Sequence, residues 1–114
     1  MMTARSSGLF AEWYARQFLR LHGFRILASR YITGRFTGRA ELDIIARRGD
    51  MAIFVEVKKR STAELGVDAV SSAQAGRLRA AAENWIRRNR WTGPARFDLA
   101  VVSGLRIRWF KNAV

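Results

Sequence analysis

The sequence predicts a single α/β domain in which helices flank a mixed sheet, with elements in the order α-β-β-β-α-β-β. Two segments carry apolar residues at helical spacing, and five shorter segments have the alternating or continuous apolar pattern of strands. The chain has 114 residues, of which 49% are hydrophobic, and this is enough for one modest core. No repeat or low-complexity tract divides it, so we expect residues 1–114 to form one domain.

The first predicted helix covers Ser6–Leu21. Ser6 or Ser7 can cap its first turn, and Gly23 is placed to end it. Large apolar residues at helical spacing predict its buried stripe: Leu9, Phe10, Trp13, Tyr14, Phe18 and Leu21. A strand over Phe24–Ile32 follows, and residues 33–39, with two glycines and two arginines, predict a basic loop.

The remaining elements are a hairpin, a helix and a second strand pair. Glu41–Arg47 and Met51–Lys58 are predicted to pair, and residues 61–68 form a linker. The second helix is predicted from Val70 to Asn89, with an apolar face made of Leu78, Ala81, Ala82, Trp85 and Ile86. After a break at Gly93-Pro94, the last two predicted strands are Phe97–Val102 and Leu105–Phe110, with a turn at Ser103-Gly104.

The charge balance predicts a polyanionic partner. The chain has 21 Lys and Arg against 9 Asp and Glu, a formal net charge of +12 and a pI near 11.7. Such an excess attracts polyanions through counterion release, and nucleic acid is the principal polyanion available to a cytoplasmic protein. We expect Arg35 and Arg39 of the basic loop, with Lys59 and Arg60, to contact phosphates.

Several classes of protein are excluded by what the sequence lacks. The absence of cysteine excludes disulfides and cysteine-based zinc sites, and one histidine cannot form a histidine cluster. No apolar run approaches the ~20 residues that a membrane span requires, and the N-terminus lacks the apolar segment of a signal peptide. We therefore expect a cytoplasmic protein with no membrane association.

The predicted hairpin places charged residues where strands are normally apolar. Alternation puts Glu41 and Asp43 on one face of the first strand, and Glu56 and Lys58 on one face of the second. A two-residue turn at Gly49-Asp50 would set Asp43 opposite Glu56 and Glu41 opposite Lys58. A three-residue turn would instead send the two acids to opposite faces.

Facing carboxylates in that register suit a metal ion. Asp43 and Glu56 would repel each other when bare, whereas a divalent cation between them would make the arrangement favourable. Oxygen ligands without histidine or cysteine favour Mg²⁺, with Mn²⁺ as an alternative, and the Val57 carbonyl could add a ligand. Lys58 would neutralise a phosphate or help to activate water.

The competing interpretation is a pair of cross-strand ion pairs on a solvated face of the sheet. That interpretation predicts polar neighbours. However, Ile45 and Phe54 share the face by alternation, so we expect helices to cover it and the acids to be costly to bury without a ligand.

These residues resemble a known signature. Asp43 followed by Glu56-Val57-Lys58 is similar to the D…(D/E)-x-K motif of the restriction-endonuclease-like, or PD-(D/E)XK, nuclease superfamily, and the element order is similar to its core. The longer segments at residues 40–46, 54–60 and 96–98 resemble the small bacterial YraN-like proteins, a nuclease-like family. This resemblance extends from about Gly8 to Val102.

The resemblance implies roles for individual residues. Asp43 and Glu56 would bind the metal, Lys58 would be the catalytic lysine, and Glu41 would be a further acid beside them. Relatives also place a glutamate in the first helix, which would make Glu12 a metal ligand; the alternative for Glu12 is an ion pair with Arg16 one turn away.

Two further positions are compared with the family in the same way. Relatives carry a glutamine near the active site in the second helix, which implies such a role for Gln74; the alternative is a solvated helix surface. The family usually has glycine where this chain has Ala40, and that difference implies a slightly altered pocket mouth.

Outside this group, three residues attract attention. His22 is interpreted as a helix-end residue, and Asp98 as a pairing or capping acid rather than a ligand. Trp91, flanked by arginines, is the tryptophan best placed to stack on single-stranded bases.

The sequence therefore predicts a Mg²⁺-dependent, endonuclease-like phosphodiesterase acting on nucleic acid, with DNA favoured over RNA and branched or nicked structures as candidate substrates. The alternative is a non-catalytic nucleic-acid-binding module that retains the nuclease fold. A third possibility is a protein-interaction subunit that forms a homodimer through the edge of its C-terminal strand.

Overall fold

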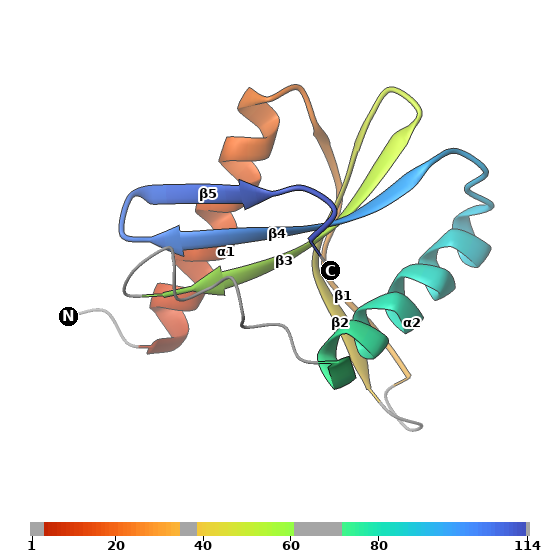
Figure 1. The fold of residues 1–114 in the computed structure, drawn as a ribbon, viewed down its shortest axis with the longest axis horizontal. Helices are drawn as coiled ribbons and strands as arrows, with labels where there is room; N and C mark the ends of the chain where they lie inside the picture. Colours follow the sequence, from red (N-terminus) through yellow and green to blue (C-terminus); the bar gives the residue numbers. More distant parts are fainter. Residues whose placement is uncertain (1–3, 35–38, 61–71, 114) are drawn as a thin grey trace.

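A computed structural model describes residues 4–34, 39–60 and 72–113 and shows two helices and a five-stranded sheet (Figure 1). The elements, in chain order, are α1 (Ala4–Leu21), β1 (Arg25–Thr33), β2 (Ala40–Arg48), β3 (Met51–Lys59), α2 (Ser72–Asn89), β4 (Ala95–Ser103) and β5 (Arg106–Phe110). The predicted α/β class and the order α-β-β-β-α-β-β are confirmed, and the predicted boundaries are close to the observed ones. Among the described residues, no helix is long and apolar enough to cross a membrane.

The sheet is mixed, and its strands lie side by side in chain order, β1-β2-β3-β4-β5. β3 and β4 are parallel, whereas the other neighbouring pairs are antiparallel. A parallel pair needs a long crossover connection, and α2 lies within the one that joins β3 to β4. β3 therefore has a strand on each side and forms the centre of the sheet.

The helices cover opposite faces of this central strand. Ala52 and Phe54 of β3 pack in a core cluster with α2, whereas Ile53 and Val55 pack in a second cluster with α1. Alternation along β3 thus supplies both cores, and this explains why β3 is apolar on both faces. The predicted apolar face of α2 is confirmed by four buried residues, Leu78, Ala81, Ala82 and Trp85, with Ile86 partly buried beside them.

The predicted buried stripe of α1 is only partly right: Phe18 packs against the core, but the fully buried face is a different one. Ala11, Ala15 and Leu19 form the buried face, while Trp13 is 49% exposed and Leu21 is 86% exposed. Two alanines four residues apart let the helix backbone approach the sheet closely, and the larger aromatic side chains are left at the flanks. The fully buried face of α1 therefore combines two small residues with one large apolar residue.

The end of α1 has the predicted form. Gly23 has a φ of 83°, and the Phe24 amide donates to the Leu19 carbonyl at 3.0 Å. This is the glycine-terminated helix end that favours a residue without a side chain. His22 lies in the same turn, and its Nδ1 is 2.8 Å from the Phe18 carbonyl, in keeping with a helix-end residue.

The hairpin has the predicted two-residue turn. Arg48 pairs with Met51, and the register continues from there to Ile44 and Val55. Gly49 has a φ of 59°, a conformation that an L side chain rarely adopts. The second hairpin turn differs slightly from the prediction: Ser103 pairs with Arg106, so the turn residues are Gly104 and Leu105.

Gly93 is required by a close backbone contact. A Cβ at this position would lie 2.4 Å from the Asp50 carbonyl oxygen, and the next residue, Pro94, accepts a 3.0 Å hydrogen bond from the Ala52 amide. We expect Gly93→Ala to lower the free energy of unfolding by about 1–3 kcal/mol, measured by urea denaturation. The matched control is Gly76→Ala in α2, where a Cβ meets nothing within 4 Å and should stabilise the helix by about 0.5–1 kcal/mol. Equal stabilities of the two variants would contradict this interpretation.

Candidate active site

The site begins at an irregularity in β2. Ala40 and Leu42 pack beside Ile45 in the α2-side cluster, although regular alternation would put Leu42 on the face opposite Ile45. The predicted division of this strand into two faces is therefore wrong at its first half. On the neighbouring strand, Arg30 has a φ of 53°, between the paired residues Ser29 and Tyr31. Arg30, with its left-handed backbone conformation, lies opposite Asp43 in the register. Asp43 is also where the alternation of side chains along β2 changes.

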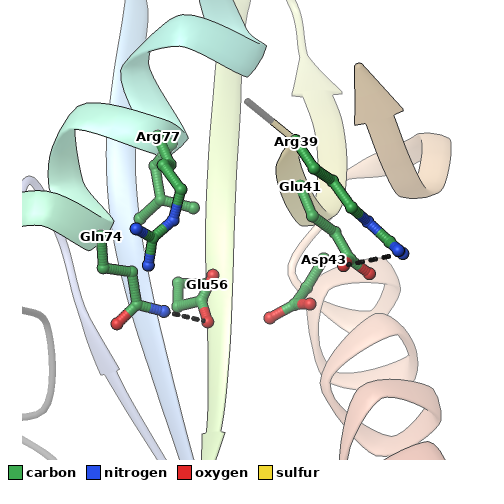
Figure 2. A pocket seen from close by; sticks show the side chains of 7 residues that line it. Arg39, Glu41, Asp43, Glu56, Gln74 and Arg77 are labelled. Carbon is green, nitrogen blue, oxygen red and sulfur yellow. Dashed lines mark hydrogen bonds and ion pairs between the residues drawn. The ribbon is translucent and has the colours of Figure 1, made fainter. Parts of the chain in front are cut away.

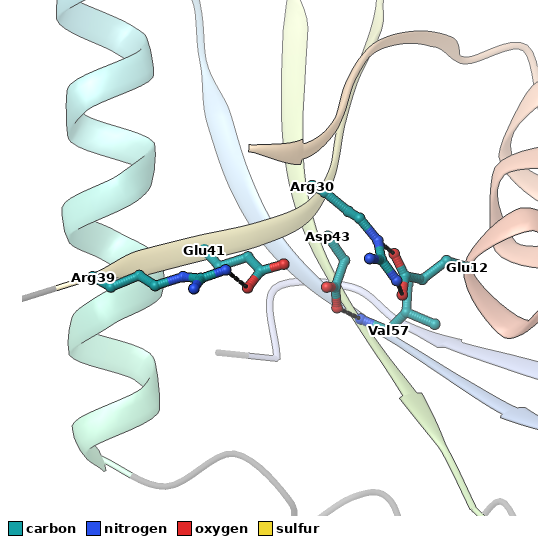
Figure 3. A network of polar contacts seen from close by, with 6 residues as sticks. All are labelled: Glu12, Arg30, Arg39, Glu41, Asp43 and Val57. Carbon is teal, nitrogen blue, oxygen red and sulfur yellow. Dashed lines mark hydrogen bonds and ion pairs between the residues drawn. The ribbon is translucent and has the colours of Figure 1, made fainter. Parts of the chain in front are cut away.

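Asp43 and Glu56 lie on either side of the point where β2 and β3 stop pairing. The last paired residues are Ile44 and Val55, one position before the two acids. Asp43 Oδ2 accepts a 2.8 Å hydrogen bond from the Val57 amide, so the carboxylate takes a backbone donor of β3 beyond the end of the ladder (Figure 3). The predicted register is confirmed, but the two acids meet where the strands separate rather than within the ladder.

Burial sets the electrostatics of this pair. Burial is the largest cause that raises the pKa of Asp43 to about 7; the nearby Glu56 carboxylate raises it further, and the Val57 hydrogen bond opposes the rise. Burial also raises the pKa of Glu56, against the opposing effect of Lys58 and of a hydrogen bond with Asp43. A cation bound between the two carboxylates would stabilise their ionised forms.

The prediction that Lys58 and Glu41 face each other is wrong. Lys58 Nζ lies 3.2 Å from Glu56 Oε1 on its own strand, and Glu41 Oε2 lies 3.8 Å from Arg39 Nη2. The physical reason is the separation of the strands: beyond Val55, β3 continues beside β4 as far as Lys59, whereas β2 continues beside β1. Lys58 therefore reaches the acid of its own motif.

Glu12 has a different partner from the one considered in the sequence. Both of its carboxylate oxygens accept hydrogen bonds from Arg30, at 3.0 Å each, and this pair lies next to Asp43 and Val57 (Figure 3). The Glu12 side chain is 14% exposed. The first helix thus brings its glutamate to the site, but a bidentate ion pair with Arg30, not with Arg16, holds it there.

A cavity of about 250 Å³ opens in front of the carboxylates (Figure 2). Its lining residues are Arg39, Glu41, Asp43, Glu56, Gln74, Arg77 and Leu78. Gln74 leans toward the sheet, as its spacing predicts, and its Nε2 donates to Glu56 Oε1 at 3.0 Å. Arg77 was not predicted as a site residue, although its position three residues after Gln74 puts it on the same side of α2 and could have indicated it.

The four predicted phosphate-binding residues are not all near the cavity. Arg35 lies outside the described residues. Arg39 lines the cavity, Lys59 is exposed at the end of β3, and Arg60 Nη1 donates to the Lys59 carbonyl at 2.7 Å. The structure therefore brings Arg39 to the acids directly and places Lys59 and Arg60 just beyond Lys58 in the chain.

The donor set can be compared with the needs of a metal ion. Within residues 4–34, 39–60 and 72–113, no three acidic, histidine or cysteine side chains form a group that could hold a metal. The candidate ligands are Asp43 and Glu56, with the Val57 carbonyl as a possible backbone ligand. Mg²⁺ is commonly bound by one or two carboxylates and keeps several waters, so this set fits it. Glu12 already gives one lone pair of each carboxylate oxygen to Arg30.

Asp98 is a buried structural acid, as predicted. It is 0% exposed and accepts two 2.8 Å hydrogen bonds from the Arg96 guanidinium, one of 2.7 Å from Trp109 Nε1 and one of 2.9 Å from the Asn112 amide. These contacts join β4 to β5 and to the turn that follows β5. Because both of its oxygens accept hydrogen bonds from these groups, Asp98 stabilises the fold and does not line the acidic cavity.

The fold and the cavity define a small mixed α/β protein with a pair of carboxylates, one buried and one partly buried, where two central strands separate. The family model of the uncharacterised protein family UPF0102 matches residues 11–102. The chain is 43% identical to a UPF0102 protein of Rhizobium etli (strain CIAT 652), over 93% of this chain and 86% of that protein. It is 38% identical to one of Shewanella halifaxensis, over 95% and 94% of the two chains. The chain therefore belongs to the UPF0102 family, and the predicted YraN-like resemblance is confirmed.

Proposed function

We propose that this protein is a Mg²⁺-dependent phosphodiester hydrolase of the restriction-endonuclease-like superfamily. Its substrate is nucleic acid, with DNA favoured over RNA. The observation that carries the proposal is the carboxylate pair of Glu56, which is buried, and Asp43, which is partly buried, with Lys58 beside it, in a chain of net charge +12. Withdrawing two facing acids from solvent, even in part, costs free energy unless a cation binds between them. Mn²⁺ is the alternative ion.

Each residue of the cavity has a proposed part. Asp43 and Glu56 would hold the ion with the Val57 carbonyl, and Gln74 would fix the orientation of Glu56 through its 3.0 Å hydrogen bond. A bound Mg²⁺ would polarise the phosphate and lower the pKa of an attacking water. Lys58, now paired with Glu56, would turn its charge toward the scissile phosphate.

The cationic rim would bind the flanking phosphates. Arg39 and Arg77 line the same cavity as the acids, and their guanidinium groups suit phosphate oxygens. Glu41, paired with Arg39, would limit how closely that arginine approaches the acids until a phosphate displaces it. Lys59 and Arg60 would extend the contact along the nucleic acid.

The test is a panel of labelled nucleic acids incubated with Mg²⁺, Mn²⁺ or EDTA. The panel includes single strands, duplexes, nicked duplexes and branched junctions, in DNA and RNA. We expect cleavage that EDTA abolishes and that Glu56→Gln reduces by at least about 100-fold. Because the substitution neutralises a buried acid, the variant should fold. The control, Glu83→Gln, changes an exposed acid of α2 outside the cavity and should cleave like the wild type.

Gln74→Ala provides a graded version of the same test. Loss of a residue that orients a ligand commonly costs about 10–100-fold in activity or metal affinity. We expect its cleavage rate to fall in that range and to recover partly at high Mg²⁺, whereas the Glu56→Gln rate should not recover. Wild-type cleavage that persists in EDTA would rule the proposal out.

The rival function is a nucleic-acid-binding module without hydrolysis. The observation in its favour is that Glu56 and Glu12 are already paired with protein cations, Lys58 and Arg30. Such a module should bind with a steep salt dependence and ignore Mg²⁺. Affinity without metal-dependent cleavage on every substrate would select it.

A further inference from the structure

Another cavity lies between α2 and β2, at the end of this contact that is far from the acidic cavity. A cavity of about 300 Å³ is lined by Leu27, Arg47, Trp85, Asn89 and Trp91. Its residues come from β1, β2, the last turns of α2 and the segment that follows. None of them belongs to the acidic cavity, which is lined by the first turns of α2, the first half of β2 with Arg39 before it, and Glu56 of β3.

The walls of this cavity combine an aromatic ring with a cation. The Arg47 guanidinium lies over the Trp91 ring, with its Cζ 5.0 Å from the ring centroid. Arg47 Nε donates to the Gly49 carbonyl at 2.9 Å, and Trp91 Nε1 donates to the Pro94 carbonyl at 3.2 Å. Both side chains are thus fixed before any ligand arrives, although Arg47 is exposed and Trp91 is only partly buried.

A second cavity of about 240 Å³ adjoins the same pair. Arg47 and Trp91 line it together with Arg90, Asp50, Thr92 and Gly93. The Asp50 carboxylate disfavours an anion beside it, so a phosphate would approach from the Arg90 side. The first cavity has no acidic residue in its lining and is the better place for a neutral flat group.

We propose that this Arg47–Trp91 site binds an unpaired nucleobase of the nucleic acid that reaches the acidic cavity. Aromatic faces and guanidinium planes are the common stacking partners of splayed bases, and Asn89 adds an amide to the wall. A volume of about 300 Å³ is at the small end of ligand sites, which suits one base and not a base pair. The role as a substrate selector rests on the proposed nuclease function.

The spacing between the two cavities fits a single strand. At a helical rise of about 1.5 Å per residue, Asn89 lies about 22 Å from Gln74 along α2. Along β2, Arg47 lies about 13 Å from Asp43 at about 3.3 Å per residue. A stacked strand rises about 3.4 Å per nucleotide, so about four to six nucleotides separate the two cavities. The site therefore selects substrates with an unpaired segment of that length beside the cleaved bond.

The test measures binding in EDTA, where no hydrolysis occurs. The probes are a single-stranded oligonucleotide of about 15 nucleotides, within the site sizes of single-strand-binding proteins, and a blunt duplex of the same length. We expect Trp91→Ala to weaken single-strand binding by about 10- to 100-fold, with duplex binding changed by less than about 2-fold. Trp91→Phe should retain most of the affinity, because it keeps a stacking face.

Two controls separate binding from folding. Trp13→Ala removes an exposed tryptophan of α1 on the other side of the sheet and should bind both probes like the wild type. A 2-aminopurine base in the single strand should be quenched by the wild type and by Trp91→Phe. If Trp91→Ala does not fold, Arg47→Gln replaces it, with the same expected loss for the single strand.

The outcomes distinguish this site from the nuclease proposal. Equal single-strand binding by the Trp91→Ala and Trp13→Ala variants, or an equal loss for duplex and single strand, would overturn the site. Selective single-strand binding with no Mg²⁺-dependent cleavage would support the site and remove the nuclease function.

Discussion

Replacing Asp98 with alanine is expected to lower the free energy of unfolding by about 3–5 kcal/mol, the usual cost of removing one partner of a buried ion pair. Asp98 is fully buried, and its two oxygens accept hydrogen bonds from Arg96, Trp109 and Asn112. Alanine would leave the Arg96 charge and two other donors without their acceptor. A domain of this size has a stability of about 5–15 kcal/mol, so the loss is a large part of the total.

Urea denaturation followed by tryptophan fluorescence measures this loss. Asp98→Asn keeps the shape and an acceptor oxygen, so it should lose less stability than alanine, and it serves as the second variant if the alanine protein does not fold. Glu83→Ala changes an exposed acid and should lie within about 0.5 kcal/mol of the wild type. A stability of Asp98→Ala within about 1 kcal/mol of the wild type would show that the network contributes little.

The parts of the fold that were predicted correctly depend on local rules. Gly49-Asp50 specified a two-residue turn, and the turn fixed the register from Arg48 and Met51 inward. Helical spacing identified the face of α2 and, through it, the approach of Gln74 to the sheet. Both patterns are contained in a short stretch of sequence, so neither depends on distant contacts.

The parts that were predicted wrongly depend on contacts between distant segments. Asp43 lies where the strand changes its alternation, opposite the left-handed Arg30 of the neighbouring strand, and no local pattern marks that residue. The pairing of Lys58 with Glu56 arises because β3 follows β4 after it leaves β2. Glu12 pairs with Arg30, 18 residues away, and not with Arg16 in its own helix.

The site also shows why composition alone was insufficient. Arginine abundance predicts an anionic partner but does not say which arginines act on it. In the structure, Arg30 binds Glu12, Arg96 binds Asp98 and Arg39 binds Glu41, so three of these cations have structural partners. Arg77 and Arg47 became candidates for nucleic-acid contact only when their positions beside cavities were known.

Asp43→Asn is expected to stabilise the metal-free protein above about pH 7 and to abolish its response to Mg²⁺. The folded-state pKa of Asp43 is about 7, above the ordinary value of 3.8, so the folded protein retains a proton that the unfolded chain has lost. Wild-type stability should therefore fall as the pH rises from about 4 to about 7. Asparagine carries no charge, keeps an acceptor for the Val57 amide and removes this penalty.

Thermal unfolding in EDTA and in Mg²⁺, at about pH 4 and about pH 8, measures both effects. In EDTA the free energy of unfolding of the variant should exceed that of the wild type by about 1–3 kcal/mol at the higher pH. The difference should be small at the lower pH, where the wild-type carboxyl is protonated. Mg²⁺ at about 100 times its Kd should stabilise the wild type by about 2.7 kcal/mol at the higher pH and leave the variant unchanged. Asp50→Asn, at an exposed acid in the hairpin turn, is the control and should show neither effect. Two outcomes would contradict this role of Asp43: a variant less stable than the wild type in EDTA at the higher pH, or a variant that Mg²⁺ stabilises as much as the wild type. Both expected effects have one cause, the Asp43 charge, which is costly in the empty site and is neutralised by the ion.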